Sequence, residues 1–233
     1  MHLFSTLPGE LISMFRGFGV SADAVGGRAY VIGAYPRSIL LKEDCSDIEL
    51  CVTGDHEKMV SHFIKHYHPV AMGKNKKTKI EGRYILIDSP YNEGDFVRIA
   101  RSRKDEAGGI GDINTEIFSR GLTLDALAIA VNAANFGDVI DIGGATDDIK
   151  AGTVRILKRS SFEADPALIF KSLYYKARYR FSFETVTEMM WNEAVKKGVY
   201  KTLSDKEIDA EIKRIKNEKY GKEVLRGTSW KKQ

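Results

Sequence analysis

One short stretch of the sequence constrains the fold more than any other. Residues 29–32 are apolar and end at Gly33, and residues 36–41 suit a short helix with a proline in its first turn, where the missing N–H costs nothing. Residues 47–52 then alternate between polar and apolar side chains, which is typical of a half-buried strand. The stretch predicts a strand, a tight turn, a helix and a second strand.

Two acidic residues, Asp47 and Glu49, lie on the second of these strands. Because side chains alternate along a strand, both carboxylates are expected on one face. Mg²⁺ prefers oxygen ligands, and two such ions about 4 Å apart can activate an attacking oxygen and stabilise a leaving one. The turn at Gly33 and Ala34 would bring backbone N–H groups close to a triphosphate, beside a helix N-terminus that favours anions. Taken alone, the Asp-x-Glu pattern is more typical of an exposed strand edge than of a metal site, and it is the preceding turn and helix that favour the metal site.

These residues resemble the signature of the DNA polymerase beta-like nucleotidyltransferase superfamily. They are more narrowly similar to the head of class II tRNA nucleotidyltransferases, the poly(A) polymerases and tRNA CCA-adding enzymes, which have Gly-Gly-Ala-Val-Arg-Asp-x-Leu-Leu before an Asp-x-Asp. The positions that agree with the family are Gly33, Arg37, Leu40, Leu41 and Asp47. Ala34, Ser38 and Glu49 replace its second Gly, its Asp and its second metal-binding Asp.

The likeness continues downstream. Residues 119–127, Ser-Arg-Gly-Leu-Thr-Leu-Asp-Ala-Leu, are similar to the family's Arg-Arg-Asp-Phe-Thr-Ile-Asn-Ala-Leu. Arg120 keeps a cation for phosphate, Gly121 replaces an Asp, and Asp125 replaces an Asn. Residues 137–155 are the closest stretch, and order and spacing agree with the family over residues 25–215.

The resemblance implies an α+β fold in two domains. A nucleotidyltransferase head with a mixed sheet flanked by helices would span residues 1–157, and a small all-helical neck with a basic C-terminal helix would span residues 158–233. Apolar spacing predicts helices near residues 11–15, 59–67, 123–131, 168–177, 185–194 and 208–215, and strands at 84–88, 96–99 and 139–141. Ser204 is expected to cap the helix that contains residues 208–215.

The resemblance also implies an activity. It is the Mg²⁺-dependent transfer of a nucleoside monophosphate from an NTP, such as ATP or CTP, to the 3′ end of an RNA, with tRNA as the expected partner. Asp47 and Glu49 would be the catalytic residues and the metal ligands. The implied nucleotide-binding residues are Gly33, Ala34, Arg37, Arg120, Asp125, Asp165 and Lys171.

Three positions depart from the family pattern where chemistry is expected. The third acidic residue of the family falls at Arg98, and Asp95 would replace it only if the strand were shifted. The family reads the incoming base with Glu-Asp-x-x-Arg on its neck, and this chain keeps Asp165 but has Leu168, which cannot hydrogen-bond to a base. Lys171 stands where a further Arg is expected, with the charge but not the bidentate fork.

These departures support two alternatives to the transferase. One is a catalytically degenerate descendant that binds RNA or a protein partner through the retained fold. The other is an enzyme that transfers a nucleotide to a protein or a small molecule, as some members of the superfamily do. The base that is added and the oligomeric state have no signature in the sequence.

Charge is distributed unevenly along the chain. Residues 150–233 contain 20 Lys/Arg against 11 Asp/Glu, whereas residues 1–149 contain 16 against 21. A basic half attached to an acidic half suggests contact with a polyanion, and a solvated helix face is the alternative. The cations in question are Lys213, Arg214, Lys216, Lys219 and Lys222. Trp230 is interpreted as a packing residue rather than a base-stacking one, and His62, His66 and His68 as surface residues.

The remaining sequence features indicate an ordinary intracellular protein. Cys45 and Cys51 belong to no metal-ligand pattern and are expected to be free thiols. The N-terminus lacks a basic region followed by a long apolar run, so we expect no signal peptide. No apolar stretch approaches the ~20 residues needed to cross a bilayer. We therefore expect a soluble, cytoplasmic protein without a membrane partner.

Overall fold

The computed structural model describes residues 4, 7–67, 78–88, 96–104, 109, 111–226 and 230. Within these residues, each helix is too short or too polar to span a lipid bilayer. The backbone forms two compact units. The first comprises Met1–Ser119 and Asp125–Gly143, and the second comprises Arg120–Leu124 and Gly144–Gln233.

This division differs from the expected boundary after residue 157. Residues 144–157 and the short segment Arg120–Leu124 pack with the second unit. The reason is apolar burial, because Leu122, Leu124, Val154 and Ile156 all lie in the core of the second unit.

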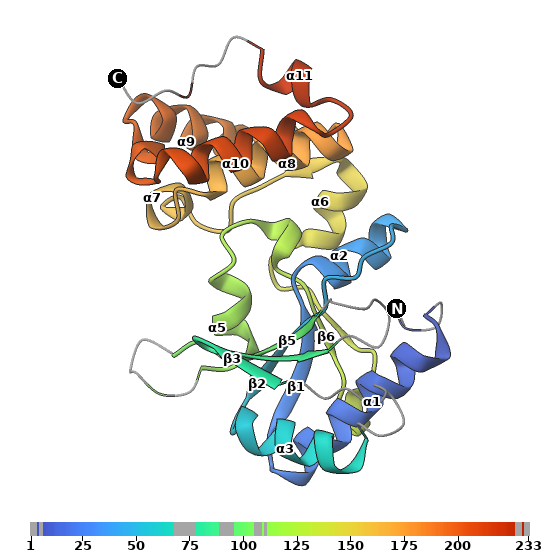
Figure 1. Ribbon diagram of the computed structural model, residues 1–233. Coiled ribbons are helices and arrows are strands. Elements are labelled where there is room, and N and C mark those ends of the chain that lie inside the picture. The colour runs from blue at the N-terminus through green and yellow to red at the C-terminus, as the bar shows by residue number, and fades with distance from the viewer. Residues whose placement is uncertain are drawn as a thin grey trace. The chain divides into compact units, whose positions relative to one another are not determined.

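The first unit is built on a seven-stranded mixed sheet (Figure 1), which confirms the α+β fold. The strand order is β3-β4-β5-β2-β1-β6-β7. All neighbouring strands are antiparallel except β2 and β5, which are parallel. The strands are β1 Arg28–Ile32, β2 Glu49–Thr53, β3 Thr78–Glu81, β4 Tyr84–Asp88, β5 Phe96–Arg101, β6 Ala128–Ala130 and β7 Val139–Ile140.

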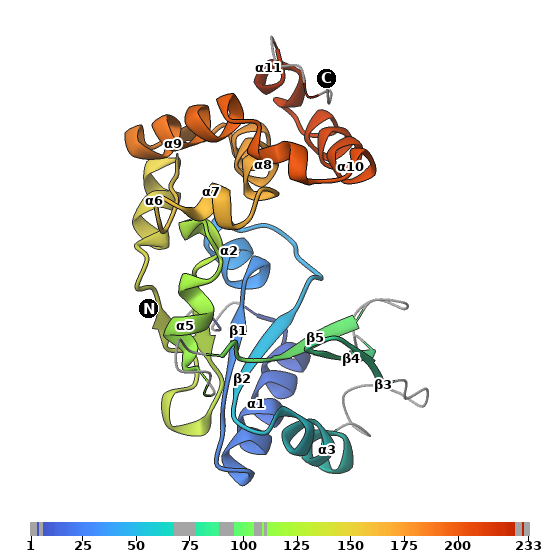
Figure 2. The ribbon, with the colours of Figure 1, turned by 90° about the vertical axis from the view of Figure 1, so that its left-hand side faces the viewer.

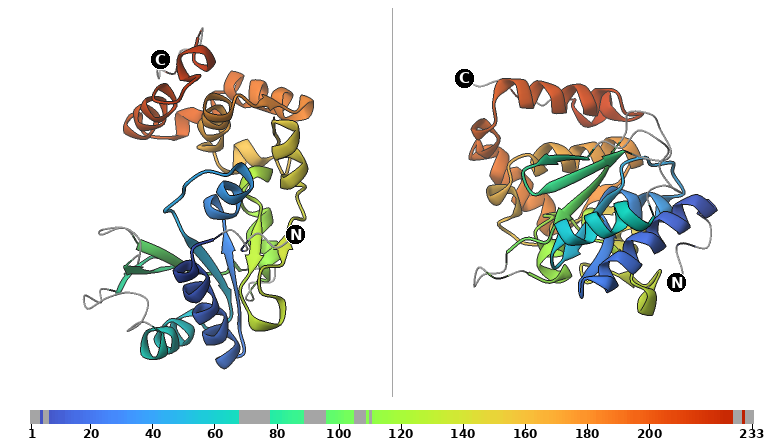
Figure 3. Two further views of the ribbon diagram at one scale, coloured as in Figure 1. Left: turned by 90° about the vertical axis from the view of Figure 1, so that its right-hand side faces the viewer. Right: turned by 60° about the horizontal axis from the view of Figure 1, so that its bottom comes forward.

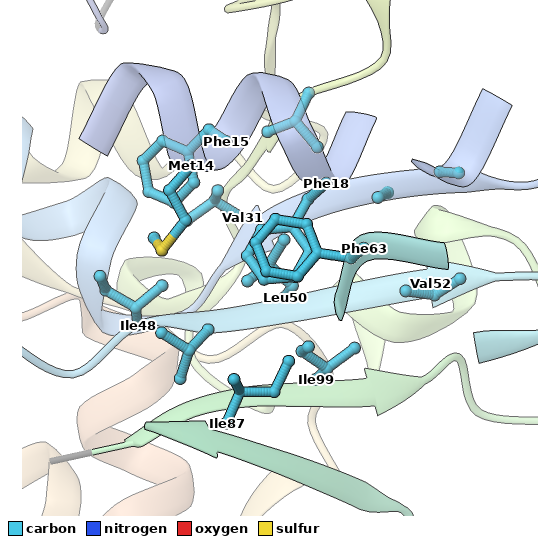
Figure 4. Packing of buried hydrophobic residues seen from close by; sticks show 14 of the residues in the cluster. Met14, Phe15, Phe18, Val31, Ile48, Leu50, Val52, Phe63, Ile87 and Ile99 are labelled. Carbon is cyan, nitrogen blue, oxygen red and sulfur yellow. The ribbon is translucent and has the colours of Figure 1, made fainter. Parts of the chain in front are cut away.

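Two helices, α1 (Gly9–Ala24) and α3 (His56–His66), pack side by side on one face of this sheet, dark blue and teal in Figure 3. Their apolar stripes meet at Phe18 and Phe63, whose rings stack with centroids 3.8 Å apart. Figure 4 shows both rings over Leu50 of β2. All three side chains are fully buried, so this face of the sheet is a closed core.

The predicted turn and helix after β1 are present. Gly33 adopts φ 75° and ψ −123°, a conformation that side-chain-bearing residues rarely take, and α2 (Ala34–Leu41) begins immediately after it. Helix α2 ends at Lys42, which is in the left-handed conformation. A short helix, α5 (Ile113–Phe118), and a 3₁₀ turn at Ala133–Asn135 complete the described part of the first unit.

The second unit is predominantly helical. Helix α8 (Leu168–Tyr179) lies among α7 (Ser161–Ala164), α9 (Thr185–Lys196) and α10 (Asp205–Lys216) (Figure 2). As expected, Ser204 caps α10, accepting a hydrogen bond from the N–H of Glu207 while the Glu207 side chain accepts from the Ser204 N–H. The remaining helical segments are α6 Ala145–Ala151, a 3₁₀ turn at Val199–Thr202 and α11 Gly221–Val224.

Two expectations about secondary structure are wrong. The helix expected at residues 123–131 is instead a 3₁₀ turn, Thr123–Asp125, followed by strand β6. Pairing with β1 overrides the helical spacing of these apolar residues, as tertiary contacts often do. The second part is also not entirely helical, because β8 (Thr153–Val154) pairs in parallel with β9 (Ser182–Phe183).

Candidate active site

The carboxylates of Asp47 and Glu49 lie on the same side of the chain and converge. Asp47 precedes β2 and Glu49 is its first residue. The intervening Ile48 points into the core with Leu50 (Figure 4), so the acidic side chains face the opposite way. Ile32 pairs with Glu49 across β1 and β2, so the Gly33 turn, which follows Ile32, lies at the end of β1 next to the backbone of Glu49.

The point on which the two carboxylates converge is a nitrogen of Arg98. Its Nη2 atom lies 2.6 Å from Asp47 Oδ1 and 3.8 Å from Glu49 Oε2. The parallel register of β2 and β5 pairs Glu49 with Arg98, and the Arg98 N–H donates to the Ile48 carbonyl at 3.0 Å. The strand is therefore in the register that puts an arginine at the third acidic position. Asp95, the shifted alternative, lies outside the described residues.

Glu49 is buried, whereas Asp47 is open to solvent. The exposed fractions of their side chains are 6% and 53%. On its other side, Glu49 Oε1 lies 3.8 Å from Arg83 Nη2 and 3.5 Å from the Tyr84 hydroxyl. A buried carboxylate needs such partners, because desolvation of an unpaired charge costs several kcal/mol, roughly.

Arg83 is itself held by a buried residue that the sequence did not single out. Glu116 of α5 accepts two hydrogen bonds from the Arg83 guanidinium, at 2.7 and 2.8 Å, and is fully buried. The hydrogen bonds to Glu116 raise the pKa of Arg83 above its ordinary value. These residues are 33 positions apart in the chain, so no local pattern could have revealed the pair.

The positively charged residue expected to hold a triphosphate is already paired. Arg37 of α2 forms an ion pair with Asp125, and only 11% and 4% of their side chains are exposed. The sequence predicts a nucleotide-binding role for both residues, and the structure brings them together inside the first unit. Next to the turn, burial and then the nearby Cys45 raise the pKa of Tyr35 to about 12, so this hydroxyl stays protonated.

In the second unit, the expected nucleotide-binding residues Arg120, Asp165 and Lys171 lie on different segments. Arg120 and Lys171 are half-buried, and Asp165 is exposed. Asp165 Oδ1 accepts a hydrogen bond from the Ala167 N–H at 3.1 Å, so this carboxylate is engaged in the turn that leads into α8.

Two departures from the family pattern, Gly121 and Leu168, touch each other in the second unit. Leu168 is buried, and a Cβ added at position 121 would lie 2.2 Å from its Cδ1 atom. Gly121 also has a φ of +79°, which disfavours any side chain there. The acidic residue that the family has at position 121 therefore has no room, and the leucine that replaces the base-reading arginine is part of a core.

The tryptophan and the described histidines singled out in the sequence lie outside the candidate site. Trp230 is buried against Phe170 and Tyr200, with ring centroids 4.9 and 5.2 Å apart, which confirms its interpretation as a packing residue. His66 is exposed as expected, whereas the half-buried His62 has its Nδ1 3.1 Å from the Ser21 hydroxyl oxygen. His68 lies outside the described residues.

The described residues contain no larger cluster of metal-ligand side chains. No group of three or more His, Cys, Asp or Glu side chains among them is arranged to hold a metal ion. Cys45 and Cys51 are free thiols. The basic side chains near the C-terminus are all exposed: Lys213, Arg214, Lys216, Lys219 and Lys222.

Comparison with known proteins confirms the resemblance inferred from the motifs, although no protein-family model matches the sequence. The chain is 27% identical over 228 residues to the A-adding tRNA nucleotidyltransferase of Geobacter sulfurreducens, a match that covers 94% of this chain and 25% of that protein. It is 27% identical over 202 residues to the enzyme of the same name from Aquifex aeolicus, covering 85% and 24%.

Solved structures of CCA-adding enzymes have the same fold. The structure of a CCA-adding enzyme in complex with CTP superposes with a TM-score of 0.84 at 25% identity, over 96% of this chain and 52% of the other. The complex with ATP gives 0.83 at the same identity and coverage. The chain thus spans about a quarter of the length of the curated relatives named here and about half of the solved ones.

Proposed function

We propose that the chain is a nucleotidyltransferase that moves a nucleoside monophosphate from an NTP to the 3′ hydroxyl of an RNA, with tRNA or a tRNA-like end as acceptor. Mg²⁺ would be the cofactor and the cytoplasm the location. The observation that carries the proposal is the convergence of Asp47 and Glu49 beside the Gly33 turn. It is supported by similarity to CCA-adding enzymes whose structures contain CTP or ATP.

The carboxylate oxygens of Asp47 and Glu49 suit a divalent cation, provided that the Arg98 guanidinium moves away from them. Two carboxylates that converge on a single cationic nitrogen also converge on the place where a metal ion would lie. Arg98 must leave that place first, and its side chain is 41% exposed, so it has room to turn towards solvent. Asp47 and Glu49 would then hold Mg²⁺, which when bound supplies charge neutralisation and a more acidic acceptor hydroxyl.

The surrounding residues would bind and orient the nucleotide. The backbone N–H groups at Gly33 and Ala34 lie at the start of α2, where a helix N-terminus favours phosphate. Arg37 would act through its ion pair with Asp125, which fixes α2 relative to residue 125.

We assign the chemistry and the phosphate contacts of Gly33 and Ala34 to the first unit, the head, and RNA contacts and further nucleotide contacts to the second unit, the neck. In the neck, Arg120 and Lys171 would supply positive charge for phosphate. Asp165 would accept a hydrogen bond from nucleotide or RNA through its remaining lone pairs, although a backbone N–H already donates to Oδ1.

Nucleotide incorporation tests the proposal directly. Purified protein with Mg²⁺, each labelled NTP in turn, and tRNA that lacks either the whole 3′ CCA or the last A should yield extended RNA. Asp47→Asn should reduce extension at least ~100-fold, because it removes the more accessible carboxylate. Asp44→Asn, an exposed acidic residue three positions earlier, is the matched control and should leave extension unchanged.

A second function is favoured by a specific observation. Arg98 between the carboxylates, and Leu168 in place of the base-reading arginine, suit a protein that binds RNA without catalysis. Such a protein would extend no RNA with any NTP. It would bind tRNA with an affinity that falls steeply with salt and needs neither Mg²⁺ nor nucleotide.

A further inference from the structure

Arg98 occupies the place between two carboxylates that the proposed reaction would give to a metal ion. A single guanidinium nitrogen contacts both Asp47 and Glu49, at 2.6 and 3.8 Å. A positive charge there neutralises the pair and repels any second cation that approaches. We propose that Arg98 is the resident counter-cation of Asp47 and Glu49, and that it suppresses the binding of free divalent cations at this pair.

The backbone makes this contact hard to avoid. Arg98 lies opposite Glu49 in the parallel ladder of β2 and β5, and β4 holds β5 from the other side by pairing Leu86 with Arg98. The start of the Arg98 side chain is therefore fixed within reach of the carboxylates. Only rotation of the side chain can remove the guanidinium.

Rotation is possible because the contact is half open. The Arg98 and Asp47 side chains are 41% and 53% exposed, and ion pairs with such exposure are weak. Arg98 therefore lowers metal affinity without abolishing it. A cation that arrives with a triphosphate has an advantage over a free one, because the phosphates add negative charge that can pair with the displaced guanidinium. This last step rests on the proposed function, whereas the suppression of free cations does not.

Among the residues that the structure describes, no other arginine near the pair is equally placed to do this. Arg83 also lies 3.8 Å from Glu49, but its guanidinium is held by two hydrogen bonds to Glu116. Arg101, at the end of β5, is exposed and has no ion pair with Asp47 or Glu49 among the contacts of the described residues. Arg101 is therefore the matched control for position 98.

Binding of Mn²⁺ in the absence of nucleotide and RNA tests the inference. The loss of the free-ion signal in electron paramagnetic resonance measures the affinity for the whole chain and its variants. Arg98→Gln should bind Mn²⁺ at least ~10-fold more tightly than the unmodified chain, because one positive charge beside the ion is gone. Arg98→Asp should bind more tightly still, because a third carboxylate then faces the ion. Arg101→Gln should match the unmodified chain.

Further variants show whether the Mn²⁺ ion binds at the Asp47–Glu49 pair. Asp47→Asn in the Arg98→Gln background should remove the gain, which assigns the ion to this pair. Should Arg98→Gln fail to fold, as judged by circular dichroism, Arg98→Met keeps much of the aliphatic stem and answers the same question. Equal Mn²⁺ affinity in the unmodified chain and a folded variant without charge at position 98 would overturn the inference, as would a gain that survives Asp47→Asn. Because no NTP or RNA is present, a failure of nucleotide incorporation leaves this result untouched.

Discussion

Two arginine–aspartate pairs in the first unit carry the same charges in very different surroundings. Arg37 and Asp125 have side chains that are 11% and 4% exposed, whereas Arg98 and Asp47 are 41% and 53% exposed. Removing one partner of the buried pair would leave a buried charge without its oppositely charged neighbour, whereas the open pair can separate into solvent at little cost. The buried pair therefore belongs to the architecture, and the open pair is free to exchange partners.

The contact between Gly121 and Leu168 in the second unit resembles the buried pair in this comparison, but neither of its residues is charged. Here two family residues that would carry charge are replaced by residues that fit together by shape. A single substitution at position 168 cannot restore an arginine, since the guanidinium would enter an apolar core. Position 98, by contrast, can be changed without rebuilding the interior.

The largest effect is expected when the buried pair is broken. Asp125→Ala should lower the free energy of unfolding by about 4 kcal/mol, because the buried Arg37 would lose the Asp125 carboxylate. Asp47→Ala, the matched change in the open pair, should lower it by less than about 1 kcal/mol. Urea denaturation followed by circular dichroism measures both. Similar losses for the two variants would remove the distinction between the pairs.

An intermediate effect is expected at the uncharged contact. Gly121→Ala should destabilise the protein by roughly 2 kcal/mol, because alanine disfavours φ +79° and its Cβ would overlap Leu168. In a Leu168→Ala background the overlap is relieved, and the same change should cost about 1 kcal/mol less. A double-mutant cycle of unfolding free energies measures this coupling. A coupling near zero would mean that backbone strain alone excludes a side chain at position 121.

The smallest effect tests whether a carboxylate that is only partly buried can also have a structural role. Glu184 is only half-buried, yet its side chain accepts hydrogen bonds from the N–H groups of Val186 and Thr187, both at 2.9 Å, and so caps α9. Glu184→Ala should cost about 1 kcal/mol at neutral pH.

The contribution of Glu184 should also depend on pH. Hydrogen bonding, first from the Val186 N–H, lowers the pKa of Glu184 below its ordinary value of 4.5. The stabilisation is therefore present above the pKa of the unfolded chain and is lost as pH falls through the lower pKa of the folded state. The difference in unfolding free energy between Glu184→Ala and the unmodified chain should shrink between pH 5 and the onset of acid unfolding. A difference that stays constant would show that helix propensity, not the charged cap, is responsible.

Local patterns predicted much of the fold. Regular apolar spacing located α1, α3, α8 and α10, and the Ser204 cap was recognisable because its hydrogen bonds run between residues three apart. Residues 123–131 were assigned to a helix because nothing within that segment records its pairing with β1. The short strand β3 and helices α5 and α6 were not anticipated, since each is too brief to show a period.

The candidate site was predictable in its residue types but not in its contacts. Sequence alone located the carboxylates and indicated that Arg98 replaces an acidic residue. It could not show that the guanidinium lies between the carboxylates, because that depends on the parallel register of β2 and β5. The pairs Arg37–Asp125 and Arg83–Glu116 were not predictable either, because their members are 88 and 33 residues apart in the chain.

The segment Arg120–Leu124 has a consequence for dissecting this protein. It belongs to the second unit, yet residues of the first unit precede and follow it in the chain. It is joined to residues beyond 143 by backbone hydrogen bonds from Thr123 to Arg155 and from Leu157 to Gly121. A single proteolytic cleavage after Gly143 would therefore leave the segment Arg120–Leu124 of the second unit on the N-terminal fragment. Separating the two units requires three cuts or a rearranged gene, because the chain passes from one unit to the other three times, and fragments expressed from one cut should fold only when combined.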